Sequence, residues 1–194
     1  MTVPEAKARL RREMRERLKY LTAAERAAAS ARICQQVRVQ DFWIASKVVL
    51  LFAPLPDEVD VWPLAITALA EGKILALPRF KASENRYAAT QVVDMERDLV
   101  PGTFGICEPV PHCLEIELAR IDVALVPGLA FDASGRRLGR GKGFYDRLLA
   151  DFIGVKCGVG LDEQIVAEIP SENHDTRMSM VVTGTRVLRE RDAV

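Results

Sequence analysis

Residues 125–147 read LVPGLAFDASGRRLGRGKGFYDR, and the rest of the chain is organised around this stretch. It begins with an apolar run that is typical of a buried β-strand, and the run breaks at Pro127-Gly128. A loop rich in glycine and arginine follows. The spacing of the next apolar side chains predicts an amphipathic helix over residues 143–152. Strand, loop and helix in this order are typical of an α/β fold.

The loop alternates glycines with cations: Gly139, Arg140, Gly141, Lys142 and Gly143. Glycine lets backbone N–H groups approach a ligand closely. The helix that follows would direct its positive N-terminal end at the same place. The combination therefore predicts a cradle for a polyphosphate, and a carboxylate one turn into the helix, Asp146, could hold a divalent ion against it.

Two known phosphate motifs do not fit the loop. A Walker P-loop needs glycine where Arg136 stands and serine or threonine where Gly143 stands. The glycines also do not follow the dinucleotide fingerprint G-x-G-x-x-G. A mobile, solvated basic loop is the alternative. The chain has 27 basic and 27 acidic residues, so this clustering of cations favours an anionic ligand.

Composition limits the class of protein. The 194 residues are enough for one domain, and 49% of them are hydrophobic, as in a globular protein. The zero net charge argues against nucleic acid as a partner. No apolar run reaches the roughly 20 residues of a membrane span, and the charged N-terminus does not resemble a signal peptide. We therefore expect a cytoplasmic protein without a membrane partner.

The cysteines indicate structural thiols. None of the four is part of a C-x-x-C pair, and there are only two histidines, so a zinc site is not expected. Reduced thiols suit a cytosolic protein. The residues concerned are Cys34, Cys107, Cys113, Cys157, His112 and His174.

A basic helix is predicted over residues 4–20. Lys7, Arg11 and Arg15 recur every four residues and so share one face, which could be merely solvated. An apolar stripe on the same helix argues that it docks on the body and presents this row at a defined place. The stripe consists of Leu10, Met14, Leu18 and Leu21.

The remaining pattern predicts an α/β domain with three layers, α/β/α, and a mostly parallel sheet. Thr22 and Glu25 form a capping box that starts a second helix. We expect one domain over residues 1–194, with an N-terminal helical hairpin at 4–39. The predicted strands are 47–53, 73–78, 88–93, 121–126, 155–161 and 178–183, the further helices are 23–38, 61–71 and 163–168, and 99–111 is a loop.

Three further positions could carry function. Glu58 follows the strand 47–53, and ligands in open α/β sheets sit at the carboxyl ends of strands, although a plain polar turn is equally compatible. Phe104 could stack on a flat ring or fill the core beneath its loop. His174 and Asp175 could act on a metal or in catalysis, or could simply form a turn.

The central stretch resembles the signature of the 5-formyltetrahydrofolate cyclo-ligase family, also called 5,10-methenyltetrahydrofolate synthetase. The resemblance is carried by PGLAFD at 127–132, by GRRLGRGKGFYD at 135–146 and by KARLR at 7–11, and its landmarks keep their order over nearly the whole chain. It implies a fold like that of NagB, RpiA and the CoA transferases. It also implies ATP-dependent closure of 5-formyltetrahydrofolate to 5,10-methenyltetrahydrofolate, with Mg²⁺ as cofactor.

The resemblance also implies partners. The expected partners are the small-molecule substrates 5-formyltetrahydrofolate and ATP, and the expected state is a monomer or weak homodimer. The alternative is a catalytically inactive paralogue that binds folate or nucleotide and has a regulatory role. An RNA-binding protein is a third possibility, which the neutral charge and the lack of an aromatic platform disfavour.

The resemblance finally implies roles for individual residues. The catalytic pair would be Arg140 and Lys142. The positions that match ATP-binding ones are Lys7, Arg11, Arg137, Leu138, Gly139, Arg140, Gly141, Lys142, Gly143, Phe144 and Tyr145. The positions that match folate-binding ones are Ala53, Glu58, Phe104 and Tyr145, and those that match magnesium ligands are Asp146 and Asp175. Two positions depart from the family pattern: Ser179 replaces a frequent aspartate and Phe144 a frequent tyrosine.

Overall fold

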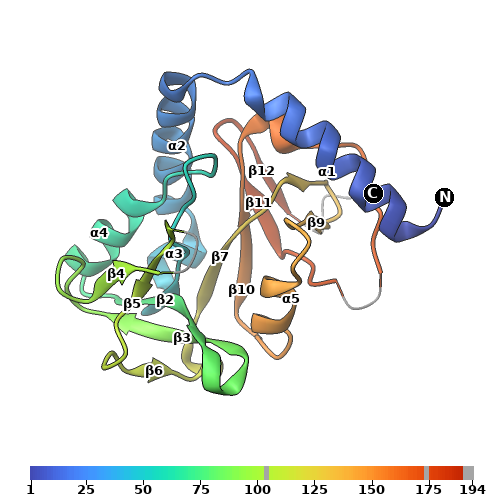
Figure 1. Cartoon of the computed structure of the whole chain (residues 1–194). Coiled ribbons are helices and arrows are strands. Elements are labelled where there is room, and N and C mark those ends of the chain that lie inside the picture. Colours follow the sequence, from blue (N-terminus) through green and yellow to red (C-terminus); the bar gives the residue numbers. More distant parts are fainter. Residues whose placement is uncertain (103–104, 173–174, 190–194) are drawn as a thin grey trace.

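A computed structural model describes residues 1–102, 105–172 and 175–189. An eight-stranded sheet forms its centre, in the order β12-β11-β10-β7-β1-β2-β3-β6 (Figure 1). The five strands from β11 to β2 run parallel, and β12, β3 and β6 add antiparallel edges. The strands are β1 (Val48–Leu50), β2 (Ile74–Lys81), β3 (Arg86–Val92), β6 (Glu115–Ile116), β7 (Val123–Pro127), β10 (Val155–Val159), β11 (Met180–Val182) and β12 (Val187–Arg189).

Both faces of the sheet are covered, which confirms the α/β prediction with a mostly parallel sheet. Side chains alternate along β1: Val49 packs into the core on one face, and Leu50 packs into the core on the other. Three helices cover the first face, and a short helix with a two-stranded hairpin covers the second. These elements are α2 (Ala23–Arg38), α3 (Asp41–Ala45) and α4 (Trp62–Ala70), then α5 (Phe144–Leu148) with β8 (Ala130–Phe131) and β9 (Arg137–Leu138).

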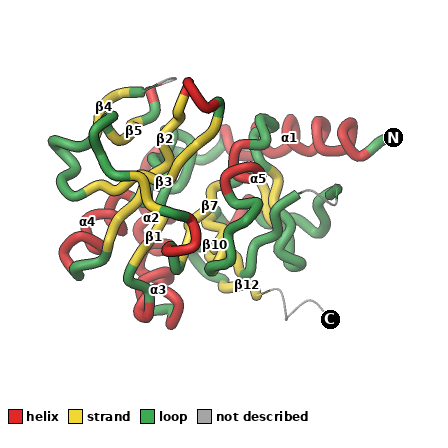
Figure 2. Tube along the Cα trace, turned by 90° about the horizontal axis from the view of Figure 1, so that it is seen from below, coloured by secondary structure: helices red, strands yellow, loops and turns green. Residues whose placement is uncertain are grey.

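Helix α1 (Val3–Lys19) docks on the body through its apolar stripe, as predicted. Thr2 and Glu5 form a capping box at its start, and Met14 is completely buried. Met14 packs with Leu138 in a separate small core beneath the helix. Figure 1 shows α1 crossing above β9 and away from α2, and Figure 2 confirms that it extends along one side of the molecule.

Several element bounds differ from the prediction. The loop 99–111 contains a hairpin of β4 (Leu99–Pro101) and β5 (Cys107–Pro109). Helix α5 ends at Leu148, four residues early, and the helix expected at 163–168 is only a 3₁₀ turn, Asp162–Gln164. Strands of two or three residues carry too little alternation to be recognised from a sequence. Further 3₁₀ turns span Ala82–Glu84 and Leu118–Arg120.

None of the helices in the described part of the chain is long and apolar enough to cross a bilayer. All four cysteines are free thiols, and Cys34 and Cys157 are buried.

Candidate active site

Helix α1 meets the glycine-rich loop directly. Arg11 Nε donates to the carbonyl oxygen of Gly139 at 2.9 Å. Gly141 has φ +105°, and a Cβ atom there would lie 3.5 Å from the Arg11 guanidinium. A side chain at this position would be strained by the backbone, and its Cβ atom would be in ordinary van der Waals contact with the arginine. Helix α1 and the glycine-rich loop are thus in direct contact, although the two residues that join them lie 128 positions apart in the sequence.

Lys7 joins the same helix to the segment before β11. Its Nζ lies 2.9 and 2.7 Å from the two carboxylate oxygens of Asp175, and 2.9 Å from Oε2 of Glu172. Burial alone would lower the pKa of the Lys7 ammonium, but the hydrogen bonds and charges of Asp175 and Glu172 outweigh it and raise the pKa above its ordinary value. The structure therefore brings two predicted site residues together and adds Glu172, which the sequence pattern did not single out.

The acidic turn after β1 faces the loop from the other side. Arg140 donates from Nη2 to Asp57 Oδ1 at 2.6 Å and from Nε to Glu58 Oε1 at 3.0 Å. Glu58 Oε2 also accepts from the backbone N–H of Leu55 at 3.1 Å, so the carboxylate is held in one orientation. The position of Glu58 at the carboxyl end of a central strand explains why it reaches this place.

Arg137 is a buried part of the loop. Its Nη1 donates to the carbonyl oxygen of Pro127 at 3.2 Å, and its Nη2 donates to Asp146 Oδ1 at 3.1 Å. Its guanidinium also lies over the ring of Tyr145, 5.4 Å from the centroid. Arg137 thus ties the end of β7 to α5. The side chain of Leu138 is buried as well, so both side chains face the interior rather than the loop surface.

Lys142 and the surrounding glycines lie on the surface. Lys142 is exposed, and its carbonyl oxygen accepts from Arg147 Nη1 at 3.0 Å. Gly143 has φ +60° at the start of α5, a conformation that glycine adopts without strain. The loop therefore presents its backbone and the Lys142 side chain outward while Arg137 fixes it from beneath.

Asp146 and Asp175 come from adjoining segments. Asp146 Oδ1 accepts from the backbone N–H of Thr176 at 3.3 Å, which places the residue after Asp175 against α5. Carboxylate oxygens are ligands that Mg²⁺ prefers, together with phosphate oxygens and water. The donor set therefore fits a magnesium ion, although each carboxylate is paired with a cation here, Arg137 or Lys7.

A row of aromatic rings leads from the sheet to α5. Phe80 and Tyr87 are cross-strand partners with ring centroids 4.9 Å apart, Tyr87 lies 3.8 Å from Phe144, and Phe144 lies 4.5 Å from Tyr145. Burial, reinforced by the charge of Glu58, raises the pKa of the Tyr145 phenol, which is neutral at ordinary pH. Sequence reasoning missed Phe80 and Tyr87 because it ended one strand at 78 and began the next at 88, whereas β2 extends to Lys81 and β3 begins at Arg86.

Of three further predicted residues, only Ala53 can be placed. Ala53 is 9% exposed and lies three residues beyond the end of β1. Phe104 lies outside the described residues, as does His174.

Comparison with known proteins gives a consistent result. The model of the 5-formyltetrahydrofolate cyclo-ligase family matches residues 3–184. The 5-formyltetrahydrofolate cyclo-ligase of Mus musculus is 32% identical over 94% of this chain and 95% of its own length, and that of Mycolicibacterium smegmatis is 37% identical over 74% and 76%. The solved structure of Aquifex aeolicus 5,10-methenyltetrahydrofolate synthetase covers 97% of this chain and 94% of its own, with a TM-score of 0.85 and 35% identity.

Proposed function

This chain belongs to the 5-formyltetrahydrofolate cyclo-ligase family, and we propose how its residues perform the reaction of that family. The enzyme converts 5-formyltetrahydrofolate to 5,10-methenyltetrahydrofolate at the expense of ATP. The formyl oxygen attacks the γ-phosphorus of ATP, and ADP leaves. N10 then attacks the activated carbon and loses its proton. The bond between this carbon and the former formyl oxygen breaks, and the oxygen leaves as part of the phosphate. Phosphorylation is needed because a formamide oxygen is a poor leaving group.

One observation carries the assignment of the ATP site: the hydrogen bond between Arg11 and Gly139, which joins the cationic helix face to the glycine loop. Phosphoryl transfer depends on positioning and on neutralising charge more than on a protein nucleophile. We place the triphosphate between α1 and the loop, with Lys7 and Arg11 on one side. Arg140 and Lys142 contact the phosphoryl group that moves. Lys7 and Arg140 would then exchange their present carboxylate partners for phosphate oxygens.

Asp146 and Asp175 are the residues that would hold Mg²⁺. The ion would neutralise charge on the phosphates when bound. The exchange described for Lys7 would release the carboxylate of Asp175, since that carboxylate now faces the ammonium with both oxygens. Arg137 would keep Asp146 in place, because its guanidinium is held between the end of β7 and the Tyr145 ring.

The aromatic row supports the placement of the folate. Flat rings bind well against aromatic side chains in offset or edge-to-face geometry. We propose that the ring system of 5-formyltetrahydrofolate lies along Phe80, Tyr87, Phe144 and Tyr145, with Glu58 accepting its hydrogen bonds. Glu58 is oriented for this by Leu55 and lies next to Arg140, so the formyl group would point toward the phosphate clamp.

The assignment is tested by following the absorbance of the methenyl product. The unaltered chain should form product only when 5-formyltetrahydrofolate, ATP and Mg²⁺ are all present. Lys142→Ala should lower turnover by roughly a hundredfold, since removal of one electrostatic donor to a transition state typically costs about 3 kcal/mol. Lys19→Ala, at the exposed end of α1, is the control and should keep full turnover.

Two results would contradict the proposal. Unchanged turnover in Lys142→Ala would remove that residue from the clamp. Binding of both substrates by the unaltered chain without any product would indicate a regulatory paralogue instead of an enzyme. We further propose that the protein acts in the cytoplasm as a monomer or weak homodimer, without nucleic acid or a membrane as partner.

A further inference from the structure

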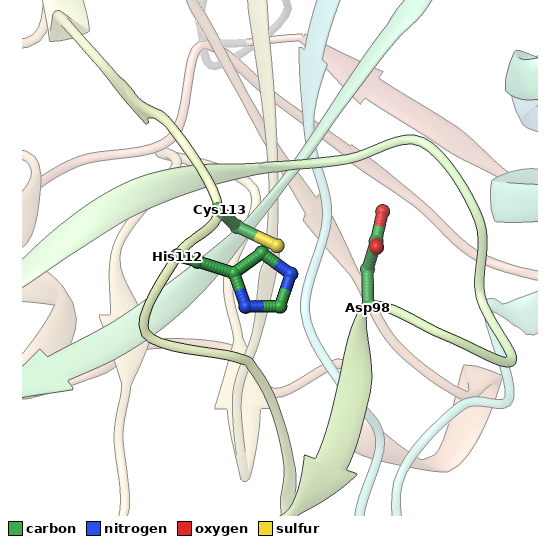
Figure 3. Close-up of side chains that lie close together, drawn as sticks. All are labelled: Asp98, His112 and Cys113. Carbon is green, nitrogen blue, oxygen red and sulfur yellow. The ribbon is translucent and has the colours of Figure 1, made fainter.

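Three side chains that commonly bind metals gather at the base of the β4–β5 hairpin. They are Asp98, His112 and Cys113, and their ligand atoms all lie within 4.8 Å of one another. Figure 3 shows the imidazole and the thiol extending from one turn toward Asp98, which immediately precedes β4. In both views the hairpin lies on a different side of the molecule from α1, so the cluster lies away from the proposed triphosphate site (Figures 1 and 2).

The carboxylate of Asp98 is held in position by the backbone, which bonds one of its two oxygens. Its Oδ2 accepts from the backbone N–H groups of Val93 and Asp94, each at 2.9 Å, and this fixes the carboxylate. Its Oδ1 accepts from Arg97 Nε at 2.7 Å. The Arg97 side chain is 65% exposed, whereas that of Asp98 is 3% exposed. Arg97 Nη2 also donates to Oδ2 at 3.2 Å, so this exposed guanidinium pairs with both carboxylate oxygens and would have to move into solvent to free Oδ1 for a cation.

There is space for an ion beside these side chains. A hollow of about 170 Å³ is lined by Asp98, His112 and Cys113 together with Arg97 and Gln91. A water molecule takes about 30 Å³ of liquid, so the hollow can hold an ion and its remaining water.

We propose that Asp98, His112 and Cys113 bind a zinc-like divalent cation, with water in the fourth position. A carboxylate, a neutral imidazole and a thiolate carry two negative charges, which balance the charge of the ion. Zinc bonds of about 2.0–2.3 Å would hold neighbouring ligand atoms roughly 3–4 Å apart, so the side chains need to close by about 1 Å. His112 is the exposed member of the cluster, so its side chain would make most of this movement.

The chemistry of the cluster argues against two other uses. Thiolate and imidazole are poor ligands for Mg²⁺, so this is not the magnesium site of the reaction. Burial and the charge of Asp98 also raise the pKa of the Cys113 thiol, which does not favour a reactive thiolate in the absence of a metal.

The ion would brace the hairpin. Asp98 and Cys113 stand at the two ends of the segment that forms β4 and β5, and the carbonyl oxygen of Asp98 already accepts from the backbone N–H of Val110 at 2.9 Å. A metal bond across these ends would hold the segment closed, and binding to the folded state alone would raise the melting temperature.

Cobalt is the probe for this site, because a thiolate bound to Co²⁺ gives a charge-transfer band in the near ultraviolet. After treatment with a chelator, the whole chain should take up one equivalent of Co²⁺ with this band, and Zn²⁺ should displace it. Cys113→Ser should lose the band, and His112→Ala should bind roughly tenfold more weakly or worse. The Arg97→Ala variant should bind Co²⁺ more tightly, because no guanidinium competes with the ion for the Asp98 carboxylate.

Cys107→Ser is the matched control, because Cys107 is a second half-buried free thiol on the same hairpin. It should keep both the band and the affinity, and circular dichroism should verify that every variant is folded. A band that persists in Cys113→Ser, or that is missing from the unaltered chain, would overturn the proposal.

Discussion

Single residues in this protein acquire their roles from burial. Lys7, Arg11 and Arg15 appear equivalent in the sequence, but the first is buried among carboxylates, the second is half-buried against the glycine loop, and the third is exposed. Arg137 likewise differs from Arg140, because Arg137 supports the loop from beneath. An electrostatic interaction is stronger between desolvated, paired charges than between charges in water. Substitution of a buried cation should therefore change stability or binding more than substitution of an exposed one.

Asp98 allows a prediction at this scale. The hydrogen bond from Arg97, then those from the backbone of Asp94 and Val93, hold the pKa of the Asp98 carboxyl far below its usual range. A lowered pKa in the folded state contributes stability above the unfolded pKa of about 3.9, and this contribution is lost as the pH falls through the folded pKa. Asp98→Asn should therefore be less stable than the unaltered chain at pH 7, with a gap that narrows below about pH 4.

Urea unfolding at several pH values, in the presence of a chelator, measures that gap. Asp151→Asn, on an exposed turn, is the control and should show a small gap at every pH. A gap for Asp98→Asn that stays constant down to about pH 2 would contradict the assigned role of its charge.

At the scale of elements, the β8–β9 hairpin determines the shape of the candidate active site. It connects the central strand β7 to the glycine loop and packs under α1 through Ala130 and Leu138. Its turn is closed by Asp132, whose Oδ1 accepts from the backbone N–H groups of Ser134 and Arg136. The position of the loop therefore depends on this turn.

Gly135 in the turn should not tolerate a side chain. It has φ +77°, its carbonyl oxygen accepts from the backbone N–H of Met178 at 2.7 Å, and a Cβ atom would overlap the carbonyl oxygen of Met178. Gly135→Ala should lower the free energy of unfolding by about 3 kcal/mol or more, since strain and overlap add. Gly72→Ala has a similar φ of +73° but open space around it, and should lose only about 1–2 kcal/mol. If thermal unfolding gave the same loss of free energy for Gly135→Ala and Gly72→Ala, the overlap with Met178 would not contribute to the effect.

At the scale of the whole molecule, the site joins both ends of the chain. Lys7 pairs with Asp175 across 168 residues, and Arg11 reaches the central loop. The acidic turn after β1 closes the other side through Arg140. Binding of a nucleotide between these parts would therefore stabilise the fold as a whole.

A nucleotide analogue that cannot be hydrolysed should raise the melting temperature of the unaltered chain. When the concentration of the analogue is about 100 times its dissociation constant, the free energy of unfolding rises by about 2.7 kcal/mol. Arg11→Met should lose most of this shift, while Arg15→Met, one turn further along the same helix and exposed, should keep it. Equal shifts in the two variants would place the nucleotide away from α1.

The sequence by itself determined the elements whose signals are local. The capping box at Thr22 set the start of one helix, and the apolar runs at β1 and β7 predicted buried strands. The alternation of glycines and cations at 139–143 indicated an anion site. These patterns depend on the backbone conformation of neighbouring residues, which a short stretch of chain specifies.

Only the tertiary structure decided which distant side chains meet. The pairing of Lys7 with Glu172, the aromatic row through Tyr87, and the cluster of Asp98 with His112 each join residues from different elements. Their contacts arise from the order of strands in the sheet and from packing across its faces, and no local pattern encodes either. The burial that separates Lys7 from Arg15 has the same origin, because a helix face becomes interior only when the body of the protein covers it.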